Sequence, residues 1–217
     1  MPAGPSLDLG DPSAVTPATL AEAYEALAGR GWRPLAGGTD AIVERSAGLA
    51  DPRGYLDLGA LEELRGIRLE DGALVLGAGT TYAELRRDPL VAEHAPELAE
   101  MAAQVGAAQI QNRGTLGGNL ATASPAGDSL PVLLALDAEI VVGSAAGERT
   151  IPAAAFFPAY RRTALAPDEL ILRVRVPRVP GRSVAFRKVG TRRAQSISVV
   201  VLAVAWSWGE AEARGTW

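Results

Sequence analysis

The chain has 217 residues, a formal net charge of −4, no cysteine and a single histidine. A chain of this length can bury a core without disulfides or metal clips. The missing cysteines exclude thiolate metal sites, iron–sulfur ligation, redox dithiols and a cysteine nucleophile within this chain, and one histidine excludes a paired-histidine metal site. We therefore predict no metal ligands and no catalytic side chains. Redox chemistry would require an organic cofactor or a partner.

The basic residues gather in one stretch of the chain. Residues 161–193 contain 10 basic and 2 acidic side chains, whereas residues 1–160 contain 10 basic and 21 acidic ones. Such a stretch can face an anionic ligand or an acidic partner. The simpler interpretation is that Arg173, Arg175 and Arg178 lie on the wet faces of edge strands. The negative net charge and an aromatic content of 5% argue against nucleic-acid binding.

The first part of the chain predicts short helices and strands. We expect an irregular segment over residues 1–15, then a helix from about Pro17 to Ala28 with Thr16 as its N-cap. The pattern that follows predicts a strand at 32–36, a short helix at 41–47 and a strand at 55–58. A break near residues 52–60 would separate a small N-terminal lobe from a larger one.

The middle of the chain begins with a hairpin. Apolar residues alternate at 67–69 and 74–76 around Asp71-Gly72, which is a strong signal for a two-residue turn. Helices are expected at 81–86, 90–105 and 129–136, with Asp128 as the N-cap of the last one.

The C-terminal third predicts mainly strands. Their expected ranges are 138–142, 149–151, 170–176 and 184–189. The apolar segment 196–205 is compatible with a strand or a buried helix, since periodicity does not separate the two. The elements do not follow a regular βαβ spacing, and this favours an α+β fold over a doubly wound sheet.

Membrane and export signals are missing from the sequence. The longest apolar run, Val199 to Trp206, is far shorter than the roughly 20 residues of a membrane span. Residues 1–5 lack the basic start and apolar stretch of a signal peptide. We therefore expect a cytoplasmic protein without a membrane span.

Two segments combine adjacent glycines with small polar residues. Residues 34–40 read Pro-Leu-Ala-Gly-Gly-Thr-Asp, and residues 115–119 read Thr-Leu-Gly-Gly-Asn. Glycine allows backbone N–H groups to approach an anion closely, so the two segments together are compatible with a diphosphate site. A tight turn is the alternative for each pair alone. Neither segment has the spacing of a Walker loop or of a dinucleotide-binding G-x-G-x-x-G motif.

Polar residues continue after the second glycine pair, although the surrounding sequence is apolar. They include Thr122, Ser124 and Asp128. Buried polar groups without partners are costly, so this density predicts a filled polar site. Asp128 would accept hydrogen bonds from sugar or ribityl hydroxyls, a role compatible with capping the helix that follows.

These motifs closely resemble the flavin subunit of the molybdenum hydroxylases, a family that includes the aerobic carbon monoxide dehydrogenase medium subunit and the middle part of xanthine dehydrogenase. The resemblance runs from about Thr16 to Val201 and is carried by residues 36–40, 111–125 with Asp128, and 186–193. It implies an α+β, two-lobed FAD-binding domain of the vanillyl-alcohol oxidase/p-cresol methylhydroxylase type. The expected divisions are a first lobe at 1–57, a second lobe at 58–178 and the start of a truncated C-terminal α/β domain at 179–217.

The resemblance also implies the residues that contact a noncovalent FAD. The first diphosphate loop corresponds to Pro34, Leu35, Ala36, Gly37, Gly38, Thr39, Asp40 and Ala41. The second corresponds to Thr115, Leu116, Gly117, Gly118 and Asn119, with Thr122 and Ser124 as further contacts. Asp128, Ile171 and Lys188 fall at other flavin-contact positions of the family.

Lys188 is the only lysine among 21 basic residues. Arginine is a poor substitute for a compact ammonium group in a tight site, which supports the flavin-side position implied for Lys188. The alternative is that a single lysine persists by chance in an arginine-rich chain and belongs to the basic stretch 161–193.

The resemblance implies a function in electron transfer. In the family, a small subunit carries two [2Fe–2S] clusters, a large subunit carries molybdopterin, and the three subunits form a heterotrimer that is commonly doubled. Electrons reach the FAD from the clusters and leave to an external acceptor such as quinone, NAD or oxygen. An alternative is a truncated flavin-binding or interaction remnant without turnover, with weaker FAD retention, because the sequence departs from the family pattern at 206–208. A self-contained flavin reductase would need acid/base groups that the sequence does not suggest.

Overall fold

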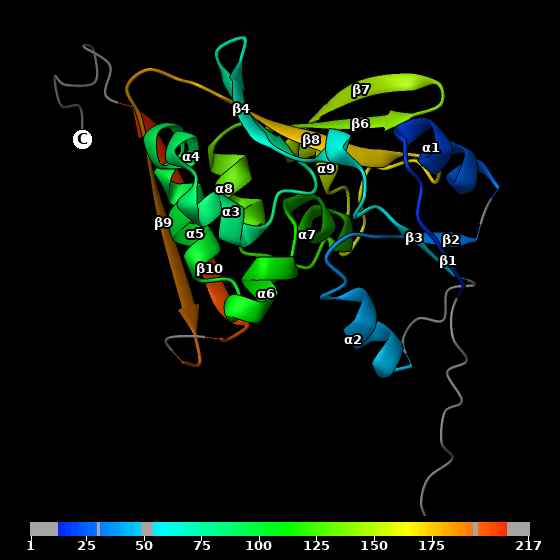
Figure 1. Ribbon diagram of the computed structural model, residues 1–217. Helices are drawn as coiled ribbons and strands as arrows, with labels where there is room; N and C mark the ends of the chain where they lie inside the picture. The colour runs from blue at the N-terminus through cyan, green and yellow to red at the C-terminus, as the bar shows by residue number, and fades with distance from the viewer. Residues whose placement is uncertain (1–12, 30, 49–53, 193–194, 208–217) are drawn as a thin grey trace, which may run out of the picture.

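The computed structural model describes residues 13–29, 31–48, 54–192 and 195–207. A three-stranded parallel sheet opens the fold, in the order β1-β3-β2. We call this sheet and its two connecting helices the N-terminal unit (Figure 1). Its elements are β1 (Ser13–Val15), α1 (Leu20–Ala28), β2 (Trp32–Leu35), α2 (Ala41–Ser46) and β3 (Gly54–Asp57).

The start of the N-terminal unit differs from the prediction. Residues 13–15 form strand β1 rather than irregular chain, because they pair in parallel with residues 54–56 of β3. Helix α1 therefore begins only at Leu20, and Thr19 rather than Thr16 is its N-cap. The Thr19 hydroxyl accepts a hydrogen bond from the amide of Glu22 at 3.3 Å. Predictions that fall on residues 1–12 lie outside the described residues.

A five-stranded antiparallel sheet forms the centre of the molecule, in the order β4-β5-β8-β6-β7. The predicted hairpin is confirmed: Asp71 and Gly72 both have positive φ angles, 49° and 73°, as a tight two-residue turn requires. The strands are β4 (Ile67–Glu70), β5 (Ala73–Gly77), β6 (Glu139–Ser144), β7 (Gly147–Pro152) and β8 (Leu170–Pro177), and a short 3₁₀ turn, η1 (Glu62–Leu64), precedes them.

Strand β8 lies in the middle of this sheet, so the prediction that its arginines mark an edge strand was wrong. Arg173 pairs with Glu148 at 2.5 Å, and Arg175 pairs with Glu139 at 3.7 Å. Both carboxylates belong to the neighbouring β6–β7 hairpin. Cross-strand ion pairs of this kind let a central strand carry charge on its solvent face.

A layer of short helices packs between the antiparallel sheet and the last two strands (Figure 1). The predicted helix at 90–105 is divided in two because Pro96 has no N–H and disfavours helical geometry at Ala95. An unpredicted helix, α6, also forms. The helices are α3 (Tyr82–Arg87), α4 (Pro89–His94), α5 (Pro96–Ala103), α6 (Ala108–Arg113), α7 (Leu116–Thr122), α8 (Ser129–Ala135) and α9 (Ala153–Phe156).

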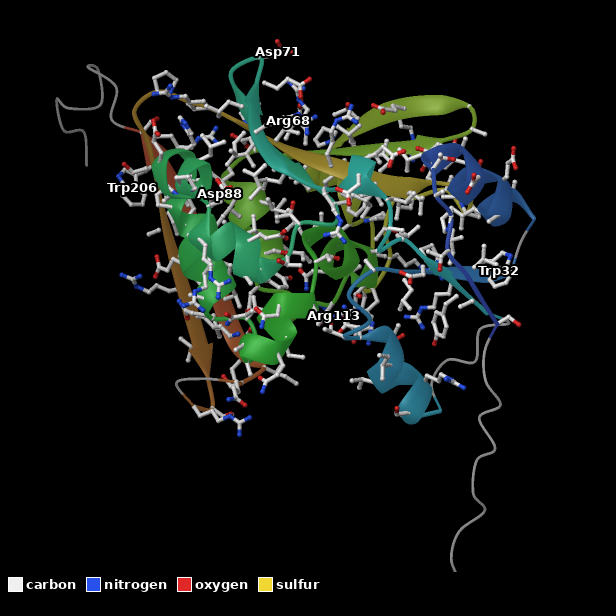
Figure 2. The ribbon with its side chains drawn as sticks, viewed as in Figure 1. Trp32, Arg68, Asp71, Asp88, Arg113 and Trp206 are labelled. Carbon is white, nitrogen blue, oxygen red and sulfur yellow. The ribbon has the colours of Figure 1, made fainter. Side chains whose placement is uncertain are left out.

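The C-terminal described segment is an antiparallel pair, β9 (Arg182–Gly190) and β10 (Ser198–Ser207). The apolar segment 196–205, for which the sequence allowed either a strand or a helix, therefore lies largely in strand β10. Val201 and Ala203 pack toward the main core, whereas Leu202 and Trp206 are exposed on the other face. Trp206 is seen on that outer side in Figure 2.

Two apolar clusters hold the layers together. The larger lies between the antiparallel sheet, the helices and β9–β10. The smaller joins the N-terminal unit to β8, because Leu27 and Leu56 share it with Leu170 and Leu172. This shared cluster packs the N-terminal unit against η1 and β8. The architecture is a mixed α/β domain, and no helix in the described ranges has the length and apolar character needed to cross a membrane.

Candidate functional site

A cavity of about 380 Å³ opens where the N-terminal unit, η1, α6, α7 and the start of β8 meet. Its volume falls within the range of about 300–1,000 Å³ that is usual for small-molecule sites. The lining combines leucines with glycines and two arginines. It comprises Pro34, Ala36, Gly37, Asp57, Leu58, Gly59, Leu61, Leu64, Arg65, Ala78, Gly79, Thr81, Asn112, Arg113, Thr115, Gly117, Gly118, Ala121, Leu165, Glu169, Leu170 and Ile171.

The first glycine segment touches the end of α6. A Cβ placed on Gly37 would lie 1.9 Å from the carbonyl oxygen of Arg113, a backbone atom that no side-chain rotation can move. Glycine at this position therefore allows the N-terminal unit to approach α6. The amides of Gly37, Gly38 and Thr39 donate to no other group in the described part of the chain. These N–H groups remain available to an acceptor.

The second glycine segment was expected to be a loop. It forms the first turn of helix α7 instead. Thr115 is the N-cap, and its hydroxyl accepts from the amide of Gly118 at 3.1 Å. The Gly117 amide donates to the carbonyl of Ala78 at 2.8 Å, and a Cβ on Gly117 would lie 2.7 Å from the Ala78 Cβ. Close packing on Ala78 therefore requires Gly117, and both amides are already used within the protein.

A hydrogen bond connects the first segment to helix α7, the helix that the second segment begins. Thr122 donates through Oγ1 to Asp40 Oδ2 at 2.9 Å and is also 3.0 Å from the carbonyl oxygen of Gly118. Residues 82 positions apart in the sequence thus fasten the start of α2 to α7.

Asp128 occupies the N-cap position of α8, as predicted, but its side chain makes no capping hydrogen bond. Its carboxylate instead accepts from Lys188 Nζ and from Ser198 Oγ, each at 2.5 Å. Lys188 also donates to the carbonyl of Gln104 at 2.8 Å. The Lys188 and Asp128 side chains are only 8% and 7% exposed. This buried ion pair, which joins β9 to α8, lies outside the cavity lining.

The predicted site residues therefore divide into two groups. The cavity is lined by Pro34, Ala36, Gly37, Thr115, Gly117, Gly118 and Ile171. Leu35, Gly38, Thr39, Asp40, Ala41, Leu116, Asn119, Thr122, Ser124, Asp128 and Lys188 do not line it. Some of the second group support the segments instead: Ser124 Oγ accepts from the Ala126 amide, and Asn119 Oδ1 accepts from the Ser129 hydroxyl.

Sequence reasoning missed several cavity residues. Arg113 lies two positions before the second glycine segment, and this proximity in the sequence was the available signal. Figure 2 shows Arg113 near the segment that leads from β2 into α2. Arg65, Asp57 and Glu169 carry no local signal, because they reach the cavity only through the docking of separate elements.

The cavity lining holds two guanidinium groups, those of Arg65 and Arg113, and two carboxylates, those of Asp57 and Glu169. Arg113 has no anionic partner in the described part of the chain, and Arg65 lies 4.0 Å from an exposed Glu62. Glu169 is held by hydrogen bonds from Arg149, which lower the pKa of its carboxyl below the usual range. Close to the site, burial and the nearby Asp128 and Asp40 carboxylates raise the pKa of Tyr82 well above its ordinary value, so this phenol stays neutral.

The chemistry of the lining fits FAD. A nucleotide diphosphate needs N–H donors, positive charge and little steric bulk, and the cavity offers open amides beside Gly37 together with two guanidinium groups. A flat ring needs apolar walls, which Leu61, Leu165 and Ile171 provide. The fold and the cavity thus define a mixed α/β domain whose cavity combines backbone N–H donors, guanidinium groups and apolar walls.

The comparisons with known proteins agree with this class. Residues 10–179 match the family described as the FAD binding domain in molybdopterin dehydrogenase. The chain is 37% identical over 170 residues to the nicotinate dehydrogenase FAD-subunit of Eubacterium barkeri, covering 76% of this chain and 57% of the relative. It is 36% identical over 143 residues to the carbon monoxide dehydrogenase medium chain of Hydrogenophaga pseudoflava, covering 66% and 50%.

Solved structures show the same similarity. Quinoline 2-oxidoreductase from Pseudomonas putida 86 superposes with a TM-score of 0.87 at 30% identity, covering 92% of this chain and 70% of the other. Reconstituted CO dehydrogenase from Oligotropha carboxidovorans gives a TM-score of 0.89 at 29% identity, covering 93% and 71%.

The chain therefore belongs to the FAD-binding domain family of the molybdopterin dehydrogenases. Its relatives are oxidoreductase subunits, among them the xanthine dehydrogenase FAD-binding subunit of Escherichia coli O157:H7. The chain spans about half to two thirds of the length of the curated relatives it matches.

Proposed function

We propose that the chain is an FAD-binding electron-transfer component of a molybdenum hydroxylase, which accepts electrons from partner iron–sulfur clusters and passes them to an external acceptor. One observation carries the proposal. Two glycine segments meet at a single cavity, although Gly37 and Thr115 are 78 positions apart in the sequence. Neither Gly37 nor Gly117 has room for a Cβ. Family membership supplies the identity of the ligand.

The chain's own residues would bind and shield the cofactor. The free amide of Gly37, which lines the cavity, and those of Gly38 and Thr39, which follow it in the chain, would donate to the diphosphate. Arg113 would neutralise part of the diphosphate charge. The Asp40–Thr122 hydrogen bond would hold the first glycine segment against helix α7. Bound FAD supplies redox chemistry that these side chains lack.

Other predicted contacts belong to a second region. In the proposal, Asp128 and Lys188 lie beside the flavin, with Ser198 holding the Asp128 carboxylate in place. Their burial as a pair fixes the Lys188 ammonium at one position, as a positioned flavin-side cation requires. The pair then acts on the cofactor from β9 and α8, opposite the N-terminal unit.

The partners follow from the division of cofactors. This chain contains no cysteine, so a small subunit would hold the [2Fe–2S] clusters and a large subunit the molybdopterin. We further propose the vanillyl-alcohol oxidase/p-cresol methylhydroxylase type of fold, with one lobe at 1–57, a second at 58–178 and a further domain beginning at 179. The three-stranded parallel sheet ends at Asp57, which supports the first division.

Two measurements test the proposal. Purified protein, stripped of bound cofactor, is titrated with FAD and followed by flavin fluorescence. It is then assembled with the iron–sulfur and molybdopterin subunits, and reduction of the flavin by the hydroxylase substrate is recorded. We expect the isolated protein to bind FAD stoichiometrically. We expect the hydroxylase substrate to reduce the flavin only in the complex. Failure to bind FAD in either form would refute the function, and binding without reduction would favour a flavin-binding remnant.

A further inference from the structure

One wall of the cavity is a turn that has no regular secondary structure of its own. Residues 164–169 connect the end of the α9 region to β8 and place Leu165 and Glu169 against the cavity. At one end, the Ala164 amide donates to the carbonyl of Phe156, a fully buried residue, at 2.9 Å. At the other end, Leu170 and Ile171 enter the central strand of the sheet.

The Glu169 carboxylate fastens this turn. Arg149 on β7 donates to both of its oxygens, from Nε at 2.6 Å and from Nη2 at 2.7 Å. The same carboxylate accepts from the amide of Ala166 at 2.7 Å, and Arg149 Nη2 donates to the carbonyl of Ala164 at 2.8 Å. One pair of side chains therefore binds both ends of the turn and ties it to the sheet.

This arrangement differs from an ordinary surface ion pair. Exposed pairs are usually weak because two flexible side chains must be ordered in water, but bidentate geometry with several further hydrogen bonds is the exception. The Glu169 side chain is only 10% exposed and is part of the cavity lining, whereas its partner Arg149 is 49% exposed. The neighbouring Arg173–Glu148 pair is also two-pronged, yet neither of its members lines the cavity.

We propose that Arg149 and Glu169 form a clasp that holds the 164–169 turn as a wall of the cavity and thereby controls how tightly the chain retains FAD. The inference rests on the proposed function. Glu169 acts as a positioning residue: without its charge the turn loosens, Leu165 leaves the wall, and water and ligand exchange more readily. The fold itself is held by the two apolar clusters, the larger of which Ala164 and Leu165 of the turn pack against, so we expect the apoprotein to fold without the clasp.

The test compares Glu169→Gln with Glu148→Gln, which removes the matched charge from the other pair. The amide of Glu169→Gln is nearly isosteric with the carboxylate and can still accept a hydrogen bond from the Ala166 amide. It has no charge and only one acceptor oxygen, so it cannot form the two-pronged ion pair with Arg149. We expect FAD to dissociate about tenfold faster from Glu169→Gln, and within about twofold of wild type from Glu148→Gln. Thermal unfolding of both apoproteins should stay within about 3 °C of wild type.

A second variant separates positioning from general weakening. Leu165→Ala removes the wall residue that the clasp positions, so it should accelerate FAD dissociation to a similar extent. Combining it with Glu169→Gln should add little, since coupled residues act through the same step. Full additivity, or wild-type dissociation from Glu169→Gln, would overturn the clasp while leaving the proposed function intact.

The remaining outcomes are also decisive. If Glu169→Gln does not fold, the clasp is a requirement of the fold rather than of the ligand, and the inference is wrong. Arg149→Lys checks this independently, because it keeps the charge and loses the two-pronged geometry; it should fold normally and release FAD faster than wild type. A wild-type protein that binds no FAD would overturn the clasp and the proposed function together.

Discussion

Replacing Gly37 with alanine should disrupt the joint between the N-terminal unit and α6. The new Cβ would lie 1.9 Å from the Arg113 carbonyl oxygen and 2.6 Å from its carbon. Gly37 does not have a positive φ angle, so alanine itself imposes no backbone strain, and the whole effect is steric. Both clashing groups are backbone, so relief requires the segments to separate.

The size of the effect follows from that separation. A normal Cβ contact is restored only if the 36–40 segment moves by more than about 1 Å, and overpacking of this kind costs about 1–3 kcal/mol. The same movement stretches the Asp40–Thr122 hydrogen bond and widens the cavity. We therefore expect FAD affinity to fall at least tenfold, which corresponds to about 1.4 kcal/mol.

The assay pairs urea unfolding of the apoprotein with an FAD titration. Gly29→Ala serves as the control, because its Cβ would lie no closer than 3.4 Å to any neighbour and it caps α1 with a negative φ of −69°. The control should match wild type in FAD affinity. A Gly37→Ala protein that binds FAD as wild type does would refute the argument that this glycine makes the close approach possible.

Three further predictions concern buried or bridging groups. Lys188→Met leaves the Asp128 carboxylate buried without its cation, so the free energy of unfolding should fall by about 3–5 kcal/mol; the double variant with Asp128→Asn should recover part of it in urea titrations. Thr122→Val removes the donor to Asp40 and should cost about 1 kcal/mol, whereas Thr122→Ser should cost less; equal losses would contradict the hydrogen bond. Burial raises the pKa of Glu97 in the folded protein, so ionisation of this carboxyl opposes folding at neutral pH, and the penalty is relieved as pH falls through the folded-state pKa. Glu97→Gln should therefore stabilise the protein at pH 7 but not at acidic pH, which unfolding measured at both pH values will show.

Local sequence signals predicted the elements that need few distant contacts. The hairpin around Asp71-Gly72 forms because its turn demands two positive φ angles that these residues tolerate. Strand β1 was missed because three exposed residues, 13–15, become a strand only by pairing with β3 about forty positions away. The arginines of β8 were misjudged for the same reason, since strand order is not encoded in a strand's own pattern.

The site divides along the same line. The sequence alone determined that this chain contains no cysteine to hold an iron–sulfur cluster, and it indicated two glycine segments and one lysine as candidate site residues, because composition and motif are local properties. Only the tertiary structure decided that Gly117 packs within a helix, that Lys188 forms an ion pair with Asp128, and that Glu169 reaches the cavity. Those outcomes depend on which backbones can approach each other, and that is fixed when the apolar clusters pack.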